Sequence, residues 1–267
     1  MQTTGKEITI SGKGLMSGRE CSVNLFPSEE KGIRFYLSNS KTPIIACAEN
    51  VVSTDNCVVL GNSEGLKVIL VEHFMAACAF AGIDSLDVCL GSFELPILDG
   101  SAAEWYKVFP KNENIKETIF EKPLASNNVM LMPANELKIT YCVNFDHPEL
   151  KNRWVSFDLS QDKAQIIEAR TFGYLKDLER FQQAGMALGV TQENTVGLTE
   201  NGYTTALRSD FEPVKHKILD LIGDLYLTGM NPLGLKAHII AYNAGHKAHV
   251  EFARVIAGER GNLENSK

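Results

Sequence analysis

Pro213-Val-Lys-His-Lys-Ile-Leu-Asp-Leu-Ile-Gly-Asp-Leu-Tyr-Leu227 is the stretch that decides the fold. Its apolar residues recur around almost the whole circumference of a helix, and a helix that is apolar on all sides is normally buried. His216, Asp220 and Asp224 interrupt this pattern every four residues, so they lie on one face of the predicted helix. Buried carboxylates and imidazoles are costly unless they are paired or bind a metal. The stretch therefore predicts a central helix with one polar stripe, and a histidine and an aspartate one turn apart can share a zinc ion.

A second apolar stretch, Val68-Ile-Leu-Val-Glu-His-Phe-Met-Ala-Ala-Cys-Ala-Phe80, holds one acid and one base. Glu72 and His73 are adjacent, and adjacent helical residues point in different directions, so the two do not simply pair with each other. Beside a metal they can take separate roles, with His73 as a ligand and Glu72 as the base for the attacking water. Together, His73, His216 and Asp220 give three ligands and one open position, the catalytic arrangement of zinc. Taken alone, His73 could equally be a core histidine with satisfied hydrogen bonds.

Other polar residues could contribute to the same chemistry. His246 directly follows a strand-like run, which makes it a candidate acid or base, or an ordinary surface histidine. Asp224 could orient such an imidazole. Lys217 shares a helix face with Asp224 and could meet a phosphate, although a lysine with its stem along the surface is an equal alternative. His238 and His249 lie in apparent strands and receive no role.

The composition narrows the class of protein. Of the 267 residues, 44% are hydrophobic and 22% are charged, which is ordinary for a globular protein. The net charge of −7 argues against bulk nucleic-acid binding. No apolar run is long enough for a transmembrane helix, and the polar start of the chain is no signal peptide. The six cysteines are scattered without a CxxC pair, so we expect reduced thiols in a cytoplasmic protein, packed in the core and not ligands of the zinc.

The predicted elements favour the α+β class, because strands and helices are clustered rather than strictly alternating. In the first half, strands are expected over 6–12, 20–27, 33–38, 43–50 and 85–90, and helices over 67–80 and 101–109. In the second half, strands are expected near 128–132, 137–145, 153–159 and 236–242, helices near 174–187 and 213–227, and a closing strand or terminal helix over 248–252. The charged stretch 111–126 predicts a boundary between an N-terminal domain, 1–120, and a C-terminal domain, 127–267. Residues 258–267 are expected to fray.

Several longer motifs resemble those of one known family. They are Val71-Glu-His-Phe-Met-Ala-Ala77, Glu94-Leu-Pro-Ile-Leu-Asp-Gly-Ser101, Ala169-Arg-Thr-Phe-Gly173, Lys215-His-Lys-Ile-Leu-Asp-Leu-Ile-Gly-Asp-Leu-Tyr226 and the shorter Gly12-Lys-Gly-Leu-Met-Ser-Gly18 and Ala244-Gly-His246. In this order, over nearly the whole chain, they are similar to the UDP-3-O-acyl-N-acetylglucosamine deacetylases of lipid A biosynthesis. The resemblance implies two similar two-layer domains, each a sheet with two helices and a small insert, packed around a zinc site. The chain departs from the family pattern at Met16, where the family has a histidine.

The resemblance also implies a role for each residue of the expected site. The zinc ligands would be His73, His216 and Asp220. The general base, the general acid, the partner of the acid and the residue that stabilises the tetrahedral oxyanion would be Glu72, His246, Asp224 and Thr171. The substrate-binding residues would be Lys217, near the nucleotide diphosphate, and Phe172, on the substrate passage. The acyl chain would lie against the apolar residues of the insert over about 150–190, among them Ile166, Ile167, Phe172 and Tyr174.

The function expected from these residues is zinc-dependent removal of the N-acetyl group of UDP-3-O-acyl-N-acetylglucosamine, with release of acetate. Two alternatives stay open: a zinc deacetylase of another nucleotide sugar or amide, and a binding protein that keeps the fold without turnover. Iron could replace zinc in a site of nitrogen and oxygen ligands. The expected partner is the small-molecule UDP-acyl-sugar, with no nucleic acid and no obligatory protein partner.

Overall fold

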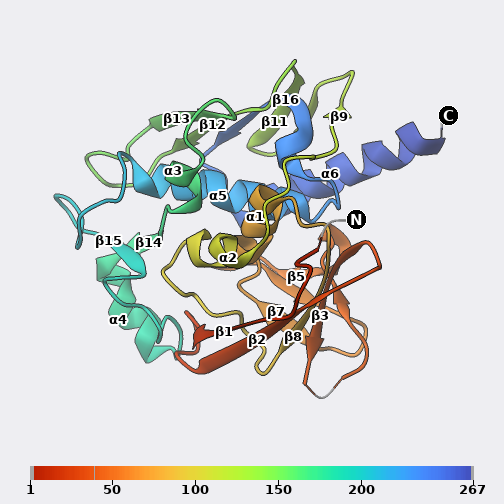
Figure 1. The fold of residues 1–267 in the computed structure, drawn as a ribbon. Helices are drawn as coiled ribbons and strands as arrows, with labels where there is room; N and C mark the ends of the chain where they lie inside the picture. Colours follow the sequence, from red (N-terminus) through yellow and green to blue (C-terminus); the bar gives the residue numbers. More distant parts are fainter. Residues whose placement is uncertain (1–2, 39, 266–267) are drawn as a thin grey trace.

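The computed structural model describes residues 3–38 and 40–265. Two sheets lie on opposite sides of a layer of helices, with the sheet from the first half of the chain at the bottom of Figure 1 and that from the second half at the top. Strands and helices are clustered in each half rather than strictly alternating, so the predicted α+β class is confirmed.

The first sheet has five strands in the order β1-β2-β8-β3-β4. Their bounds are Ile8–Lys13 for β1, Glu20–Pro27 for β2, Gly32–Leu37 for β3, Ile44–Ile45 for β4 and Ser85–Leu90 for β8. Neighbouring strands are antiparallel except β3 and β8. Alternate residues, such as Val23 and Leu25 of β2, are buried because successive side chains of a strand point to opposite faces. Phe35 of β3 packs edge-on against Phe74 of the helix α1 (Glu72–Ala81), so helices cover this buried face.

The second sheet has six strands, with β10-β11-β16-β12-β13 in order and β9 paired with β16. Their bounds are Thr118–Ile119 for β9, Leu124–Ser126 for β10, Val129–Pro133 for β11, Lys138–Val143 for β12, Arg153–Asp158 for β13 and Leu235–Tyr242 for β16. β9 belongs to the charged stretch 111–126 and joins this second sheet. The division into domains 1–120 and 127–267 stays a prediction.

Two helices, α1 and α5 (Glu212–Tyr226), pack against each other at the centre of the molecule (Figure 1). Every residue of α1 is buried, and so is every residue of α5 except Lys217. The central helix predicted over 213–227 is thus confirmed, and its apolar circumference lies in the core. Shorter or peripheral helices surround this pair: α2 (Ala103–Val108), α3 (Ala164–Ile167) and α6 (His246–Asn265). Within the described part of the chain, no helix is long and apolar enough to cross a membrane.

Each half also carries a small additional element. In the first half, β5 (Val51–Ser53), β6 (Val59–Gly61) and β7 (Lys67–Ile69) form a three-stranded antiparallel sheet. In the second half, the parallel pair β14 (Thr171–Tyr174) and β15 (Thr195–Leu198) is joined by α4 (Leu175–Gln183). Two short 3-10 turns, Ala48–Asn50 and Pro232–Gly234, complete the elements.

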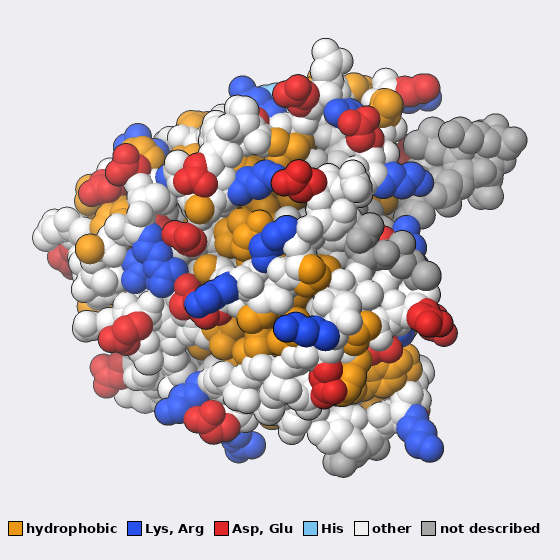
Figure 2. All heavy atoms as spheres, viewed as in Figure 1, with side chains coloured by type: hydrophobic (Ala, Val, Ile, Leu, Met, Phe, Trp, Pro, Cys, Tyr) orange, Lys and Arg blue, Asp and Glu red, His pale blue; other side chains and the backbone are white. Residues whose placement is uncertain are grey.

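Figure 2 shows the charges on the face of the molecule that is also seen in Figure 1. Acidic and basic side chains are interspersed over this face, and apolar side chains are exposed between them near its middle. No block of a single charge sign covers the face, although the net charge of the whole chain is −7. All six cysteines are free thiols, and four of them are buried: Cys21, Cys57, Cys78 and Cys142.

Two predicted elements of the first half are wrong in part. The helix expected over 67–80 begins only at Glu72, because residues 67–69 pair with β6 as strand β7. Leu70 then has a φ of 68°, a left-handed conformation that separates strand from helix. The expected end of that helix is confirmed, since Gly82 follows it with a φ of 70°. The strand expected over 43–50 is limited to Ile44–Ile45, and residues 48–50 form a 3-10 turn.

The end of the chain also differs from the expectation. Residues 248–252 belong to the helix α6, so the alternative of a closing strand is wrong, as is the strand assigned to His249. His249, Phe252, Ala253 and Ile256 are buried, the spacing of one helix face, and α6 packs on α5. The helix continues to Asn265, beyond the point where fraying was expected, and residues 266–267 lie outside the described part of the chain.

The contact between α1 and α5 depends on Gly223. A Cβ atom added at this position would lie 2.1 Å from the backbone oxygen of Glu72, well inside van der Waals contact. The missing side chain therefore lets the backbones of the two central helices touch. This close approach sets the distance between the polar residues that each helix contributes.

Gly223→Ala is expected to lower the free energy of unfolding by about 1–3 kcal/mol, because the new Cβ meets backbone and the two helices must move apart. Denaturant unfolding measures the change. The matched control is Gly258→Ala in α6, where a Cβ meets nothing within 4 Å. That change is expected to raise stability by up to about 1 kcal/mol, the helix preference of alanine over glycine. Equal effects of the two substitutions would contradict the close contact.

Candidate metal centre

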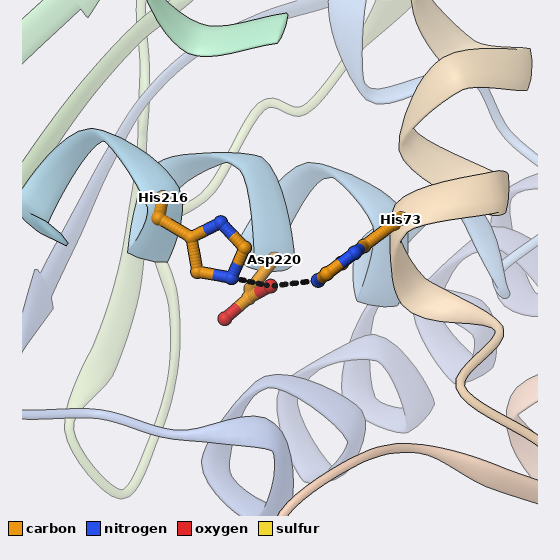
Figure 3. Close-up of side chains that lie close together, drawn as sticks. All are labelled: His73, His216 and Asp220. Carbon is orange, nitrogen blue, oxygen red and sulfur yellow. Dashed lines mark ion pairs between the residues drawn. The ribbon is translucent and has the colours of Figure 1, made fainter. Parts of the chain in front are cut away.

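Three potential metal ligands meet between α1 and α5 (Figure 3). His216 and Asp220 lie one turn apart on α5, and His73 extends toward them from α1. Nε2 of His216 lies 3.3 Å from Asp220 Oδ1, and Nε2 of His73 lies 3.7 Å from the same oxygen. One ligand atom of each residue lies within 4.8 Å of the others. The structure thus brings together the three residues that the sequence places at a metal.

The two histidines of this group are held in the neutral form. Burial and, to a smaller extent, the neighbouring His216 lower the pKa of His73 to about 3. Burial also lowers the pKa of His216, although Asp220 opposes this. Nδ1 of His216 donates a hydrogen bond to the backbone carbonyl of Ala169 at 2.9 Å, which leaves the lone pair on Nε2, facing Asp220. Neutral imidazoles are the form that binds a metal.

Asp220 is a buried carboxylate with one oxygen that lacks a donor. Burial alone would raise its pKa, but His216, Lys217 and His246 lower it well below its ordinary value. Oδ2 accepts a hydrogen bond from Lys217 Nζ at 2.7 Å. Oδ1 faces both histidines and has no hydrogen-bond partner among the described residues. A buried anionic oxygen without a partner is costly, so this oxygen fits a cation placed between the three side chains.

The donor set fits a divalent metal that accepts nitrogen and oxygen ligands. Two neutral imidazoles and one carboxylate are a common protein contribution to a catalytic zinc site, which keeps a further position open. The same donors suit iron. Lys217, expected near a phosphate, has its ammonium group on Asp220, where it also lies beside the metal centre.

An acid and a base flank the centre. Oε2 of Glu72 accepts a hydrogen bond from the backbone N–H of Val58 at 3.0 Å, and burial raises the pKa of Glu72 to about 7. His246 opens α6, with Nε2 at 3.9 Å from Glu72 Oε1 and 3.8 Å from Asp220 Oδ2. Burial would lower the pKa of His246, but the carboxylates of Asp224 and Asp220 raise it to about 9. Near neutral pH, Glu72 can therefore accept a proton and His246 can donate one.

Asp224 connects α5 to α6 through two histidines. Its Oδ2 lies 2.8 Å from Nδ1 of His246, the pairing that the resemblance implies. The same oxygen lies 2.8 Å from Nδ1 of His249, a residue that the sequence analysis leaves without a role. Residues three apart in a helix lie on the same face. A helical prediction for this segment would therefore have placed His249 beside His246.

A cavity of about 480 Å³ lies beside the centre, between β14, α4 and loops of both halves. Thr171 and Phe172 at the start of β14 line it, and the Phe172 ring lies 6.0 Å from the His216 ring, centroid to centroid. The other apolar lining residues are Leu15, Met16, Tyr174, Leu175, Leu178, Phe181, Met186, Ala187 and Val190. Ile166 and Ile167, expected to supply apolar surface here, are instead buried in the core.

Backbone hydrogen bonds close one wall of this cavity. The N–H of Leu188 donates to the carbonyl of Met16 at 3.2 Å, and the N–H of Gly189 donates to the carbonyl of Leu15 at 2.9 Å. A Cβ added at Gly189 would lie 2.0 Å from the carbonyl oxygen of Gly14. The loop of the first half and the insert of the second half therefore meet backbone to backbone.

A buried ion pair holds Thr171 and Phe172 beside the centre. Glu212, at the start of α5, is fully buried, and its Oε1 accepts hydrogen bonds from the backbone N–H and the Nε of Arg170, both at 2.9 Å. Its Oε2 accepts from the backbone N–H of Arg208 at 2.7 Å. This pair could not be predicted from the sequence, because the two residues lie 42 positions apart and no local spacing links them.

The fold and the centre together define a class: an α+β protein with a buried centre of two histidines and one aspartate, flanked by an acid–base pair, as in metal-dependent hydrolases. The model of the UDP-3-O-acyl N-acetylglycosamine deacetylase family matches residues 1–258, and the chain belongs to this family.

Curated relatives support the same assignment over almost the whole chain. A protein of Leptospira biflexa is 33% identical over 97% of this chain and 90% of its own length. One of Syntrophotalea carbinolica is 36% identical over 95% of this chain and 86% of its own length. A third, of Syntrophus aciditrophicus, is 34% identical over 98% of this chain and 87% of its own length. Each carries the name UDP-3-O-acyl-N-acetylglucosamine deacetylase.

Glu212→Ala is expected to lower the free energy of unfolding by about 3–5 kcal/mol, because it leaves the buried Arg170 guanidinium without its anion. Chemical denaturation followed by circular dichroism gives the value. Glu104→Ala removes an exposed glutamate beside Lys107 and serves as the control, with an expected change within about 0.5 kcal/mol. A loss below about 1 kcal/mol in the Glu212 variant would show that the pair does not hold this region together.

Proposed function

We propose that the chain hydrolyses the N-acetyl group of UDP-3-O-acyl-N-acetylglucosamine, with zinc held by His73, His216 and Asp220. Water adds to the acetamide carbonyl, the C–N bond breaks, and the products are acetate and the free amine of the glucosamine. One observation carries the proposal: three buried ligands converge within reach of an acid and a base, in a member of this deacetylase family.

The charges of the three ligands support a divalent ion. Two neutral imidazoles and one carboxylate leave a site with a single negative charge and one oxygen without a donor. When bound, zinc would supply Lewis-acid chemistry, polarising the substrate carbonyl and lowering the pKa of a water molecule.

In the proposed mechanism, Glu72 is the general base. Its raised pKa of about 7 makes it a stronger base than an exposed glutamate, and its hydrogen bond from Val58 fixes the carboxylate. Glu72 takes a proton from the water that attacks the acetamide carbon. Its position next to His73 in the chain keeps it beside the metal ligands without using it as one.

His246 is the proposed general acid. Asp224 accepts the hydrogen of Nδ1, so Nε2 is the nitrogen that points toward Glu72 and Asp220. With its pKa raised to about 9, the imidazole carries a proton on Nε2 at neutral pH. It donates this proton to the departing glucosamine nitrogen.

The remaining site residues would bind and orient the substrate. The hydroxyl of Thr171, at the start of β14, is proposed to stabilise the tetrahedral oxyanion. Lys217 would lie near the nucleotide diphosphate, and its partly exposed position at the edge of the centre supports this. Phe172 borders both His216 and the cavity, so it would separate the reacting acetamide from the acyl passage.

The cavity is the proposed site of the acyl chain. Its lining is mainly apolar, from Leu15 and Met16 on one side to Phe181 and Met186 on the other. Burial contributes about 0.8 kcal/mol per methylene, so roughly ten methylenes would supply several kcal/mol after ordering costs. An acyl chain in this cavity favours the UDP-acyl-sugar over another nucleotide sugar as the substrate.

The alternatives are less well supported by the arrangement of side chains. A binding protein without turnover has no need for Glu72, His246 and Asp224 to be kept together around a metal centre. The substrate of a deacetylase of an unacylated nucleotide sugar would have no acyl group to fill the apolar cavity. We place the reaction in the cytoplasm, where six free cysteines stay reduced.

Substitutions should separate the metal ligands from the catalytic pair. Asp220→Ala is expected to lose bound zinc, because it removes the only anionic ligand. Glu72→Ala and His246→Ala are expected to lower turnover by roughly 10²-fold or more with zinc retained. Metal content by atomic emission and release of acetate are the two measurements. His238→Ala, in β16 and bonded to Thr140, is the control and should change neither. Zinc loss in Glu72→Ala would reject its assignment as a base.

The acyl passage predicts a strong dependence on the fatty acyl group. The value of kcat/KM for the UDP-acyl-sugar should exceed the value for plain UDP-N-acetylglucosamine by at least about 10²-fold, since the acyl chain contributes several kcal/mol of binding. Phe181→Asp in α4, which puts a charge into the cavity, should lower the value for the acylated substrate alone. A ratio near one for the two substrates would favour the deacetylase of another nucleotide sugar.

A further inference from the structure

His249 is a fully buried imidazole that the proposed mechanism does not use. It lies in α6, three residues after His246, and both rings reach Asp224 of α5. Both of its ring nitrogens are engaged: Nδ1 is 2.8 Å from Asp224 Oδ2, and Nε2 is 2.8 Å from the hydroxyl oxygen of Tyr141 in β12. Because both nitrogens of this buried ring have hydrogen-bond partners, its orientation is fixed.

The contacts determine where the proton of His249 lies. A carboxylate oxygen can only accept, so Nδ1 must carry a hydrogen toward Asp224. The opposite neutral tautomer would set a bare lone pair against the carboxylate. Burial lowers the pKa of His249, so the ring is neutral and Nε2 accepts from the hydroxyl of Tyr141. That hydroxyl also lies 2.8 Å from the carbonyl of Ala244, and its single proton serves one of the two partners at a time.

Two imidazoles share one carboxylate oxygen. Oδ2 of Asp224 accepts from both His246 and His249, whereas Oδ1 has no hydrogen-bond partner among the described residues. With His246 alone, the carboxylate could turn and offer either oxygen. The second bond, from a ring fixed by Tyr141, holds Oδ2 in a single direction.

We propose that His249 is a positioning residue for the deacetylation: by fixing Asp224, it fixes the ring of His246 that donates the proton. The inference rests on the proposed function, because it concerns the imidazole assigned there as the general acid. His249 itself does not touch the reacting atoms. Its effect is therefore expected on kcat and not on KM.

Two substitutions of similar size distinguish positioning from packing. His249→Asn keeps an N–H donor, because asparagine carries its amide nitrogen on the same γ carbon that carries Nδ1 in histidine. His249→Leu keeps an apolar filling of the site and loses the donor. Positioning predicts that the leucine variant lowers kcat about tenfold, while the asparagine variant stays within about threefold of the unchanged chain. KM should stay within about twofold in both.

The second measurement does not depend on turnover. In proton NMR spectra of the zinc-loaded protein, the hydrogens on Nδ1 of His246 and His249 should give two resonances far downfield, protected from exchange with water. Both variants lose the His249 signal. In His249→Asn the His246 signal should stay sharp, and in His249→Leu it should broaden or shift. His238→Asn, in β16 and bonded to Thr140, is the control and should leave both signals unchanged.

Three results would overturn the proposal. The first is an equal loss of kcat in the two variants, and the second is a greater loss with asparagine than with leucine, the order that packing predicts. The third is an unchanged His246 signal in His249→Leu. If the unchanged chain does not release acetate from the UDP-acyl-sugar, the proposed function fails, and the NMR comparison still decides whether His249 fixes the imidazole of His246.

Discussion

The structure depends on the burial of two carboxylates in the central helix. Asp220 and Asp224 lie in α5 with almost no contact to solvent, where an unpaired charge would cost several kcal/mol. Each therefore meets polar groups brought to it by the packing: Asp220 accepts from Lys217 of its own helix and faces His73 of α1, and Asp224 accepts from two histidines of α6. The arrangement of the helices around α5 follows from this requirement as much as from apolar packing. A helix that left either carboxylate without its partners would not be stable in the core.

Two further devices position the side chains of the site: a close helix contact and a buried ion pair. Gly223 lets α1 and α5 touch, so His73 reaches the ligands of α5. The pair of Arg170 and Glu212 attaches the start of β14 to the start of α5, so that the backbone carbonyl of Ala169 meets His216. The first device acts through the backbone, and the second through a buried side-chain pair whose carboxylate also accepts from backbone N–H groups. These contacts fix the positions of the side chains at the centre, so the site is preorganised.

The sequence predicts best where one pattern is strong over many residues. The helix of residues 213–227 is apolar around its circumference, and its polar stripe contains Asp220, Asp224 and His216, so both its burial and its site residues could be inferred. The stretch 67–80 is misread because an apolar run has no period, and only the pairing of β7 with β6 makes its first residues a strand. The place of His249 in a helix, beside His246, could not be predicted for a related reason. Alternate apolar residues around it suit a short strand, and only packing on α5 decides for a helix.

The backbone wall between residues 14–16 and 188–189 has a consequence for how such a cavity can vary. Because the two segments meet through N–H and carbonyl groups, the frame of the cavity does not depend on which side chains stand there. Met16, Met186 and Val190 project from this frame into the same space. One side chain at a time can therefore change the length of this cavity, while its backbone frame stays fixed. The metal centre, on the other side of Phe172, need not change with it.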